Sequence, residues 1–123
     1  MPTLAEASLT DAERRTLDRF VELLREELGD ELRSVWLYGS RARGEPPHEE
    51  SDVDLIVVTE HAGWNETTPI YRLLEQAADE QGTSPAFFSV HVYDPAHVAQ
   101  RREIRSFFFQ EVDRDKIVLA GEP

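Results

Sequence analysis

Two aspartates near the middle of the sequence are spaced as metal ligands. Asp52 and Asp54 stand two residues apart at the start of an apolar run, residues 55–58, which predicts a strand covered on both faces. Side chains alternate between the faces of a strand, so both carboxylates leave the same face. Two carboxylates this close repel each other when both are ionised, and a divalent cation relieves the repulsion. Because Mg²⁺ and Mn²⁺ prefer oxygen ligands, the pair predicts a site for one of these metals.

A glycine–serine pair closes an earlier predicted strand and is a candidate phosphate-binding turn. Gly39 and Ser40 follow residues 34–38, which are rich in β-branched and aromatic types. Glycine lets the backbone turn tightly and approach a ligand, and amides at a helix start favour anions. The serine hydroxyl is a further donor, and Arg41 and Arg43 add positive charge. Taken singly, these features have plainer interpretations: a solvated strand end, a simple turn, and arginines paired with surface carboxylates.

The segments that would position these residues alternate between helical and strand patterns. A helix is predicted over 11–28, because Thr10 and Glu13 form a capping box and apolar residues recur at helical spacing. The other predicted elements are strands at 34–38, 52–59, 86–93 and 116–120, helices at 39–44, 69–80 and 95–109, and loops at 45–51 and 61–68. The alternation predicts one α/β (α+β) domain over 1–123, with a small mixed central sheet and helices packed mainly on one side.

The composition narrows the classes of protein further. The chain has 123 residues, which suit one domain, and it has no cysteine, which excludes disulfides and thiolate metal sites. Its formal net charge of -12 repels a phosphate backbone, so we expect no broad nucleic-acid binding. The amino-terminal residues lack the pattern of a signal peptide, and no apolar stretch approaches the length of a membrane span. We therefore expect a cytoplasmic protein with no membrane association.

The combination of the two motifs resembles a known family. Residues 37–44 (LYGSRARG) and 51–55 (SDVDL) look like the signature of minimal nucleotidyltransferases, within the polymerase-beta-like nucleotidyltransferase superfamily. The resemblance implies the nucleotidyltransferase fold and transfer of a nucleoside monophosphate from a nucleotide triphosphate to a hydroxyl. It also implies nucleotide-binding residues, namely Gly39, Ser40, Arg41, Arg43 and Ser51. Asp52 and Asp54 would then be the catalytic metal ligands for Mg²⁺ or Mn²⁺.

The third carboxylate of that family has no acidic counterpart on the later predicted strand. We align its position with His91, which shares a face with Ser89 and Tyr93. Three interpretations follow. Two aspartates suffice with His91 near the site, or the domain binds nucleotide with weak or no catalysis, or the register differs and Asp94 reaches the site. Asp94 also precedes Pro95, a pairing typical of a helix cap.

Two functions from different classes remain open after this departure. The first is an enzyme that modifies a hydroxyl, with a partner protein as one acceptor. The second is a catalytically weak or inactive module that binds a partner. The resemblance implies a small helical HEPN-type partner in a toxin–antitoxin pair, with this chain as the antitoxin. A domain this small also has an open site, which a partner or a second copy in a homo-oligomer would complete.

The last predicted helix carries two further features. Arg101, Arg102 and Arg105 give it a basic face, for which we expect ion pairs with Glu103 or the first helix rather than contact with an acidic partner or nucleotide. Residues 107–109 are three consecutive phenylalanines, which cannot all face one core. We expect them to occupy the core and a covered edge, with a partner surface as the alternative.

Overall fold

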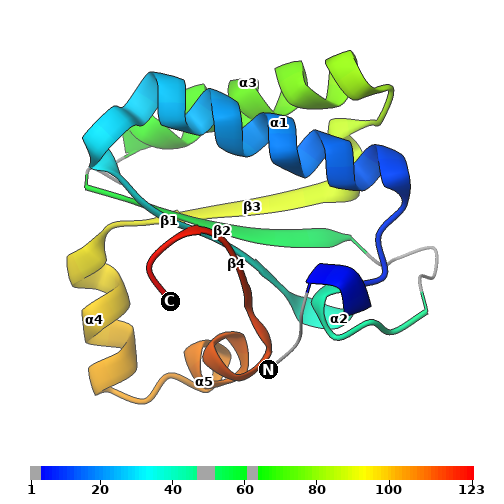
Figure 1. Ribbon diagram of the computed structural model, residues 1–123. Helices are drawn as coiled ribbons and strands as arrows, with labels where there is room; N and C mark the ends of the chain where they lie inside the picture. Colours follow the sequence, from blue (N-terminus) through cyan, green and yellow to red (C-terminus); the bar gives the residue numbers. More distant parts are fainter. Residues whose placement is uncertain (1–3, 47–51, 61–63) are drawn as a thin grey trace.

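The computed structural model describes residues 4–46, 52–60 and 64–123, and its centre is a mixed sheet (Figure 1). The described strands lie in the order β3-β2-β1-β4. Their bounds are β1 Leu32–Tyr38, β2 Val53–Thr59, β3 Phe88–Tyr93 and β4 Ile117–Gly121. β1 pairs antiparallel with β2 and with β4, whereas β2 and β3 are parallel. The predicted α/β class and mixed sheet are therefore confirmed.

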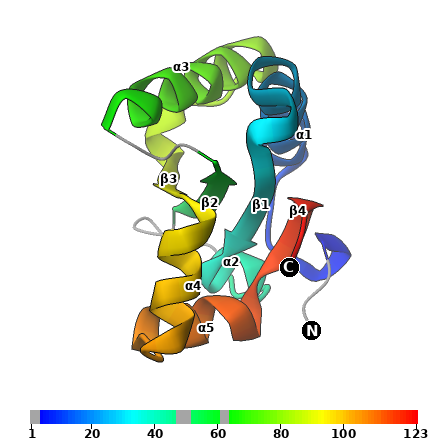
Figure 2. The same cartoon turned by 90° about the vertical axis from the view of Figure 1, so that its left-hand side faces the viewer.

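Two long helices cover one face of this sheet (Figures 1 and 2). α1 spans Asp11–Leu28 as predicted, and its capping box is formed: the Glu13 amide donates to Thr10 Oγ1 at 3.1 Å and the Thr10 amide donates to Glu13 Oε1 at 2.8 Å. α3 spans Trp64–Gln81 and packs beside α1. Their apolar stripes bury against the inward residues of β1 and β2 in one core cluster. α1 and α3 thus form one helical layer that covers this face of the sheet.

The opposite face is covered by shorter helices, an arrangement the sequence did not predict. Trp36, Tyr38, Ile56 and Val58 form a second core cluster with residues of α4 (Pro95–Glu103) and α5 (Phe107–Asp115). Apolar residues at alternate positions of β2 thus enter different cores, which confirms a strand buried on both faces. The single helix predicted over 95–109 is wrong, because the chain turns at Arg105, whose φ is +53°.

Smaller differences concern the connections. The predicted loop over 61–68 is wrong for residues 64–68, which belong to α3; Pro69 lies inside that helix rather than at its start. Residues 47–51 and 61–63 of the two predicted loops lie outside the described part. The predicted short helix is α2 (Gly39–Ala42), and 3-10 helices occur at Leu4–Glu6, Gly29–Glu31 and Pro85–Phe87. Among the described residues, no helix combines the length and apolar character that a membrane span needs.

Candidate active site

The Gly-Ser turn and one of the two aspartates meet where β1 ends. Tyr38 is the register partner of Asp54 across the antiparallel β1–β2 pair, so Gly39 follows directly beside that carboxylate. Gly39 has φ +80°, and a Cβ on this residue would lie 2.4 Å from Asp54 Oδ2. Glycine is therefore required twice, by the left-handed backbone and by the close approach of the carboxylate. The structure brings together two of the residues that the sequence singled out.

The two aspartates differ in their surroundings. Its side chain is half-buried whereas Asp52 is exposed. Burial raises the pKa of Asp54 above its ordinary value, the charge of Asp52 raises it further, and His91 and Arg43 partly oppose the shift. A raised pKa means that the site lacks enough positive charge for both carboxylates. A cation bound between them would supply that charge.

Asp52 and Asp54 are the residues that could hold a divalent cation. Two carboxylates offer the oxygen ligands that Mg²⁺ takes, with water and substrate phosphates filling its other positions. Across residues 4–46, 52–60 and 64–123, no group of three or more His, Cys, Asp or Glu side chains is arranged to hold a metal.

The register of β3 changes the assignment of the third position. Asp54 pairs with Ser89, whereas His91 pairs with Ile56, which is two residues further along β2. Ser89 rather than His91 thus lies where a third carboxylate would face Asp54, although His91 is near enough to affect the pKa of Asp54. The alternative that Asp94 reaches the site is wrong. It lies beyond the far end of β3 and caps α4, accepting from the His97 amide at 2.6 Å.

The two arginines of the turn have different roles. The Arg41 side chain is buried, forms an ion pair with Glu13 of α1 and donates to the Ser8 carbonyl at 2.5 Å. In return the Ser8 amide donates to the Arg41 carbonyl at 2.9 Å. These contacts join the turn to the amino-terminal segment and give Arg41 a structural role, and its nucleotide contact stays a prediction.

Arg43 faces the site instead. Its guanidinium donates to Asp115 Oδ2 of α5 at 3.2 Å and pairs with Glu45. It remains partly exposed, and its charge lowers the pKa of Asp54. Ser40 is half-buried in α2, and Ser51 lies outside the described residues. Gly39, Ser40, Arg41 and Arg43 are the predicted nucleotide-binding residues within the described chain, and Arg43 is the arginine that affects the pKa of Asp54.

Tyr38 lies beside the site, and the sequence analysis gave it no functional role. Burial raises the pKa of its hydroxyl, and the charges of Asp54 and Tyr93 raise it further, so the hydroxyl stays protonated as a donor. Its ring meets Phe108 edge-on, with centroids 5.5 Å apart. Tyr38, Gly39, Arg43 and Phe108 line a pocket of about 100 Å³ that α5 closes from below. Its position directly before the Gly-Ser turn was the available signal.

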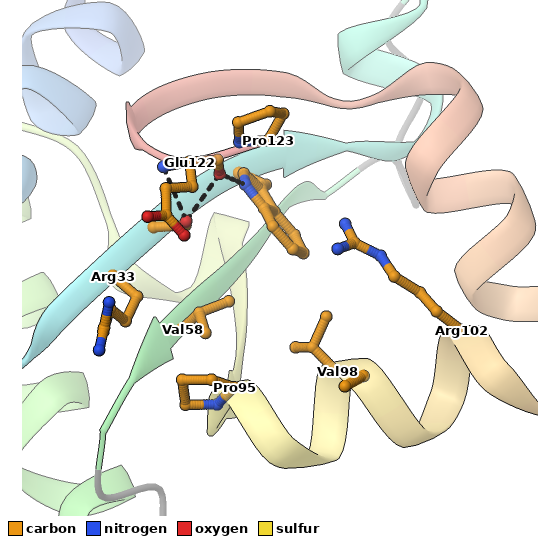
Figure 3. Close-up of a pocket in the computed structure, with 10 residues that line it drawn as sticks. Arg33, Val58, Pro95, Val98, Arg102, Glu122 and Pro123 are labelled. Atoms are coloured by element: carbon orange, nitrogen blue, oxygen red, sulfur yellow. Dashed lines mark hydrogen bonds between the residues drawn. The ribbon is translucent and has the colours of Figure 1, made fainter.

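A larger pocket lies on the same face at the other end of the strands (Figure 3). It measures about 210 Å³ and is lined by Trp36, Val58 and Val98 among others. The indole of Trp36 donates to the Glu122 carbonyl at 2.8 Å, and the Arg102 guanidinium lies 5.4 Å from the indole ring. Ile56 and Trp36 separate this pocket from Asp54 along the strands, so it is not part of the aspartate site.

The mixed sheet, the Gly-Ser turn and the adjoining aspartate define a nucleotidyltransferase-like fold. The family described as Polymerase beta, Nucleotidyltransferase matches residues 20–119. The chain belongs to this family. A comparison with curated proteins found no match.

Solved structures similar to this chain come from toxin–antitoxin complexes. One mutant of the MntA-HpeT complex has a TM-score of 0.51 and 21% identity over 85% of this chain and 72% of that chain. A second mutant has a TM-score of 0.53 and 20% identity over 86% and 73%. A toxin–antitoxin structure with AMP-PNP has a TM-score of 0.53 and 23% identity over 86% and 73%. At these identities the likeness concerns the fold.

Proposed function

We propose that this chain transfers a nucleoside monophosphate from a nucleotide triphosphate to a hydroxyl on a partner protein. The observation that carries the proposal is the contact of Gly39 with Asp54, which joins the phosphate-binding turn to the carboxylate pair. A triphosphate on the turn would lie directly beside the aspartates. Membership of the nucleotidyltransferase family supports the same reaction class.

In the proposed reaction, the acceptor oxygen bonds to the α-phosphorus as the bond to pyrophosphate breaks, and the acceptor proton passes to solvent. Gly39 and Ser40 bind the phosphates through backbone amides and the hydroxyl, and Arg43 offsets their charge. Asp52 and Asp54 would hold Mg²⁺ or Mn²⁺. When bound, the cation supplies positive charge to the reacting phosphate and to the leaving pyrophosphate. The protein then contributes mainly by orienting the two substrates.

The toxin–antitoxin relatives support a partner protein as the acceptor. Similar chains come from MntA-HpeT complexes, and one similar structure contains AMP-PNP. We therefore propose an antitoxin-like role with a small helical HEPN-type partner, and ATP as the first nucleotide to test. The pocket beside the Gly-Ser turn measures only about 100 Å³, so a protein acceptor would contact the site from outside the pocket.

The test is transfer of label from α-³²P nucleotides, each of the four in turn, to a HEPN-type partner protein in the presence of Mg²⁺. Asp52→Asn and Asp54→Asn should abolish transfer and weaken Mn²⁺ binding measured by electron paramagnetic resonance. Asp79→Asn, an exposed aspartate on α3, is the matched control and should retain both. Excess EDTA should stop transfer and Mg²⁺ should restore it.

A second function is favoured by the non-acidic register position of Ser89. A module with only two carboxylates would bind its partner without efficient transfer. Absence of transfer with all four nucleotides, together with retained partner binding, would establish this second function. Transfer that persists in both aspartate variants would refute the proposed site.

A further inference from the structure

An apolar corner stands exposed where α4 turns into α5. Ile104 is 61% exposed, Phe107 75% and Phe108 39%. Phe109, the next residue, is 1% exposed and belongs to the second core cluster. The chain therefore directs these three side chains outward, whereas the neighbouring Phe109 is packed in the core. The expectation that the phenylalanines fill a core and a covered edge is wrong for Phe107.

The corner is held in one shape by contacts beneath it. Arg102 of α4 donates to both carboxylate oxygens of Asp113 in α5, at 3.0 and 2.8 Å. The Ser106 amide donates to the Arg101 carbonyl at 3.0 Å. The Gln110 side-chain amide donates to the Arg105 carbonyl at 3.2 Å. A surface fixed in this way loses little conformational entropy when a partner binds, which favours association.

Two arginines flank the exposed Ile104 in the chain. Arg101 and Arg105 are exposed, and within the described chain neither has a carboxylate within ion-pair distance. Together with Arg102, Ser106, Phe109, Gln110 and Asp113, they line a hollow of about 260 Å³ beside the corner. The predicted pairing of this basic face with Glu103 or α1 is wrong, since Arg102 pairs with Asp113 instead. In a chain of net charge -12, such a corner selects a partner that is itself acidic.

The corner is continuous with the aspartate site. The Phe108 ring contacts Tyr38, whose register partner is Asp54. Phe108 also shares the 100 Å³ pocket with Gly39 and Arg43. Figure 2 shows α5 on the same side of the sheet as α2. A protein seated on this corner would thus extend across Phe108 to the Gly-Ser turn.

We propose that Ile104, Phe107 and Phe108, with Arg101 and Arg105, form the docking surface for the acceptor protein, which presents an acidic surface with apolar side chains. That the docked protein is the acceptor rests on the proposed function; the docking surface itself does not. Apolar side chains of the acceptor protein pack against Ile104 and Phe107, and its acidic side chains pair with Arg101 and Arg105. Apolar exposure on this scale favours a protein over a nucleic acid, whose backbone the chain repels.

The probe is a fluorescein-labelled helical peptide with leucines on one face, glutamates on the other and one tyrosine. We expect the full chain to bind it in fluorescence anisotropy, and to bind a version with serines in place of leucines more weakly. Phe107→Ser and the pair Arg101→Glu, Arg105→Glu should each weaken binding about tenfold. The matched controls are Tyr71→Ser, an aromatic 41% exposed on α3, and Arg15→Glu on α1. Both controls should bind as the unaltered chain does.

Equal loss in the controls and the corner variants would overturn the docking surface, as would unchanged binding by the corner variants. Binding of poly(U) RNA that is as tight as peptide binding and insensitive to Phe107→Ser would overturn it in favour of a polyanion site. A dimer in analytical ultracentrifugation that Phe107→Ser dissociates would assign the corner to a second copy. Label transfer to the HEPN-type partner separates the two proposals: no transfer with any of the four nucleotides, together with peptide binding that the corner variants weaken, overturns the enzyme and leaves the docking surface standing.

Discussion

The carboxylate of Asp54 lies so close to Gly39 that a Cβ on residue 39 would be 2.4 Å from Asp54 Oδ2. The two residues are brought together by the antiparallel register of β1 and β2. The turn that would bind phosphate and the carboxylate that would bind metal are therefore one rigid unit. A change in either residue should disturb the other.

Gly39→Ala should consequently lose both stability and metal binding. The left-handed backbone at φ +80° costs an alanine about 1–2 kcal/mol, and the Cβ would also displace the Asp54 carboxylate. Gly82→Ala is the matched control, because Gly82 has φ +75° with nothing within 4 Å of an added Cβ. Urea unfolding should show a loss in both variants, whereas Mn²⁺ binding should fall only in Gly39→Ala. Equal Mn²⁺ binding by the two variants would contradict the coupling.

Ser89→Asp should strengthen metal binding, since Ser89 is the register partner of Asp54. Neighbouring strands lie about 4.8 Å apart, so a carboxylate there would face the existing pair. We expect Mn²⁺ affinity to rise about tenfold, a gain of about 1.4 kcal/mol. His91→Asp is the matched comparison, because it lies two residues or about 6.6 Å further along the strand. A larger gain in Mn²⁺ affinity for His91→Asp than for Ser89→Asp would show that His91, as the sequence alignment had it, occupies the position of the third carboxylate.

Glu13→Gln should destabilise the protein and loosen the turn. Arg41 and Glu13 are both buried, and the loss of one charge leaves the other uncompensated, which costs about 3 kcal/mol in typical buried pairs. Glutamine retains an acceptor for the capping box, so the loss reports the ion pair rather than the cap. Glu45→Gln, which breaks the exposed pair with Arg43, is the control and should change stability little. Thermal unfolding with similar midpoints for the two variants would argue against this role of Arg41.

Asp113 should contribute stability that acid removes. Burial raises the pKa of Asp113, but hydrogen bonds from Arg102 and Lys116 outweigh it, and the pKa lies below its ordinary value. The unfolded carboxyl therefore protonates first, so the contribution is present above about pH 4 and disappears as the pH falls through the lower folded pKa. Asp113→Asn should lower the free energy of unfolding by about 1 kcal/mol at pH 7. The difference from the unaltered chain should shrink below pH 4, whereas exposed Asp79→Asn should show no such trend; a constant difference would refute the linkage.

Local patterns predicted much of the fold because they report local physics. The capping box of Thr10 and Glu13 satisfies backbone amides at the start of α1 whatever lies elsewhere, and that helix has the predicted bounds. The continuous apolar run of β2 likewise predicted a strand covered on both faces. The break between α4 and α5 was missed because residues 104–106 include neither glycine nor proline, and the turn uses Arg105 in a left-handed conformation.

The sequence alone determined the reaction class to be tested, through the Gly-Ser turn and the Asp-x-Asp pair, because those residue types and spacings carry their chemistry with them. Only the tertiary structure decided which neighbours act with them. Arg41 and Arg43 look equivalent in the sequence, yet one is buried against Glu13 and the other faces Asp54. Ser89 replaced His91 opposite Asp54 because strand register is set by pairing between distant segments. A shift of two residues keeps every side chain on its own face, so the pattern of one strand does not reveal it.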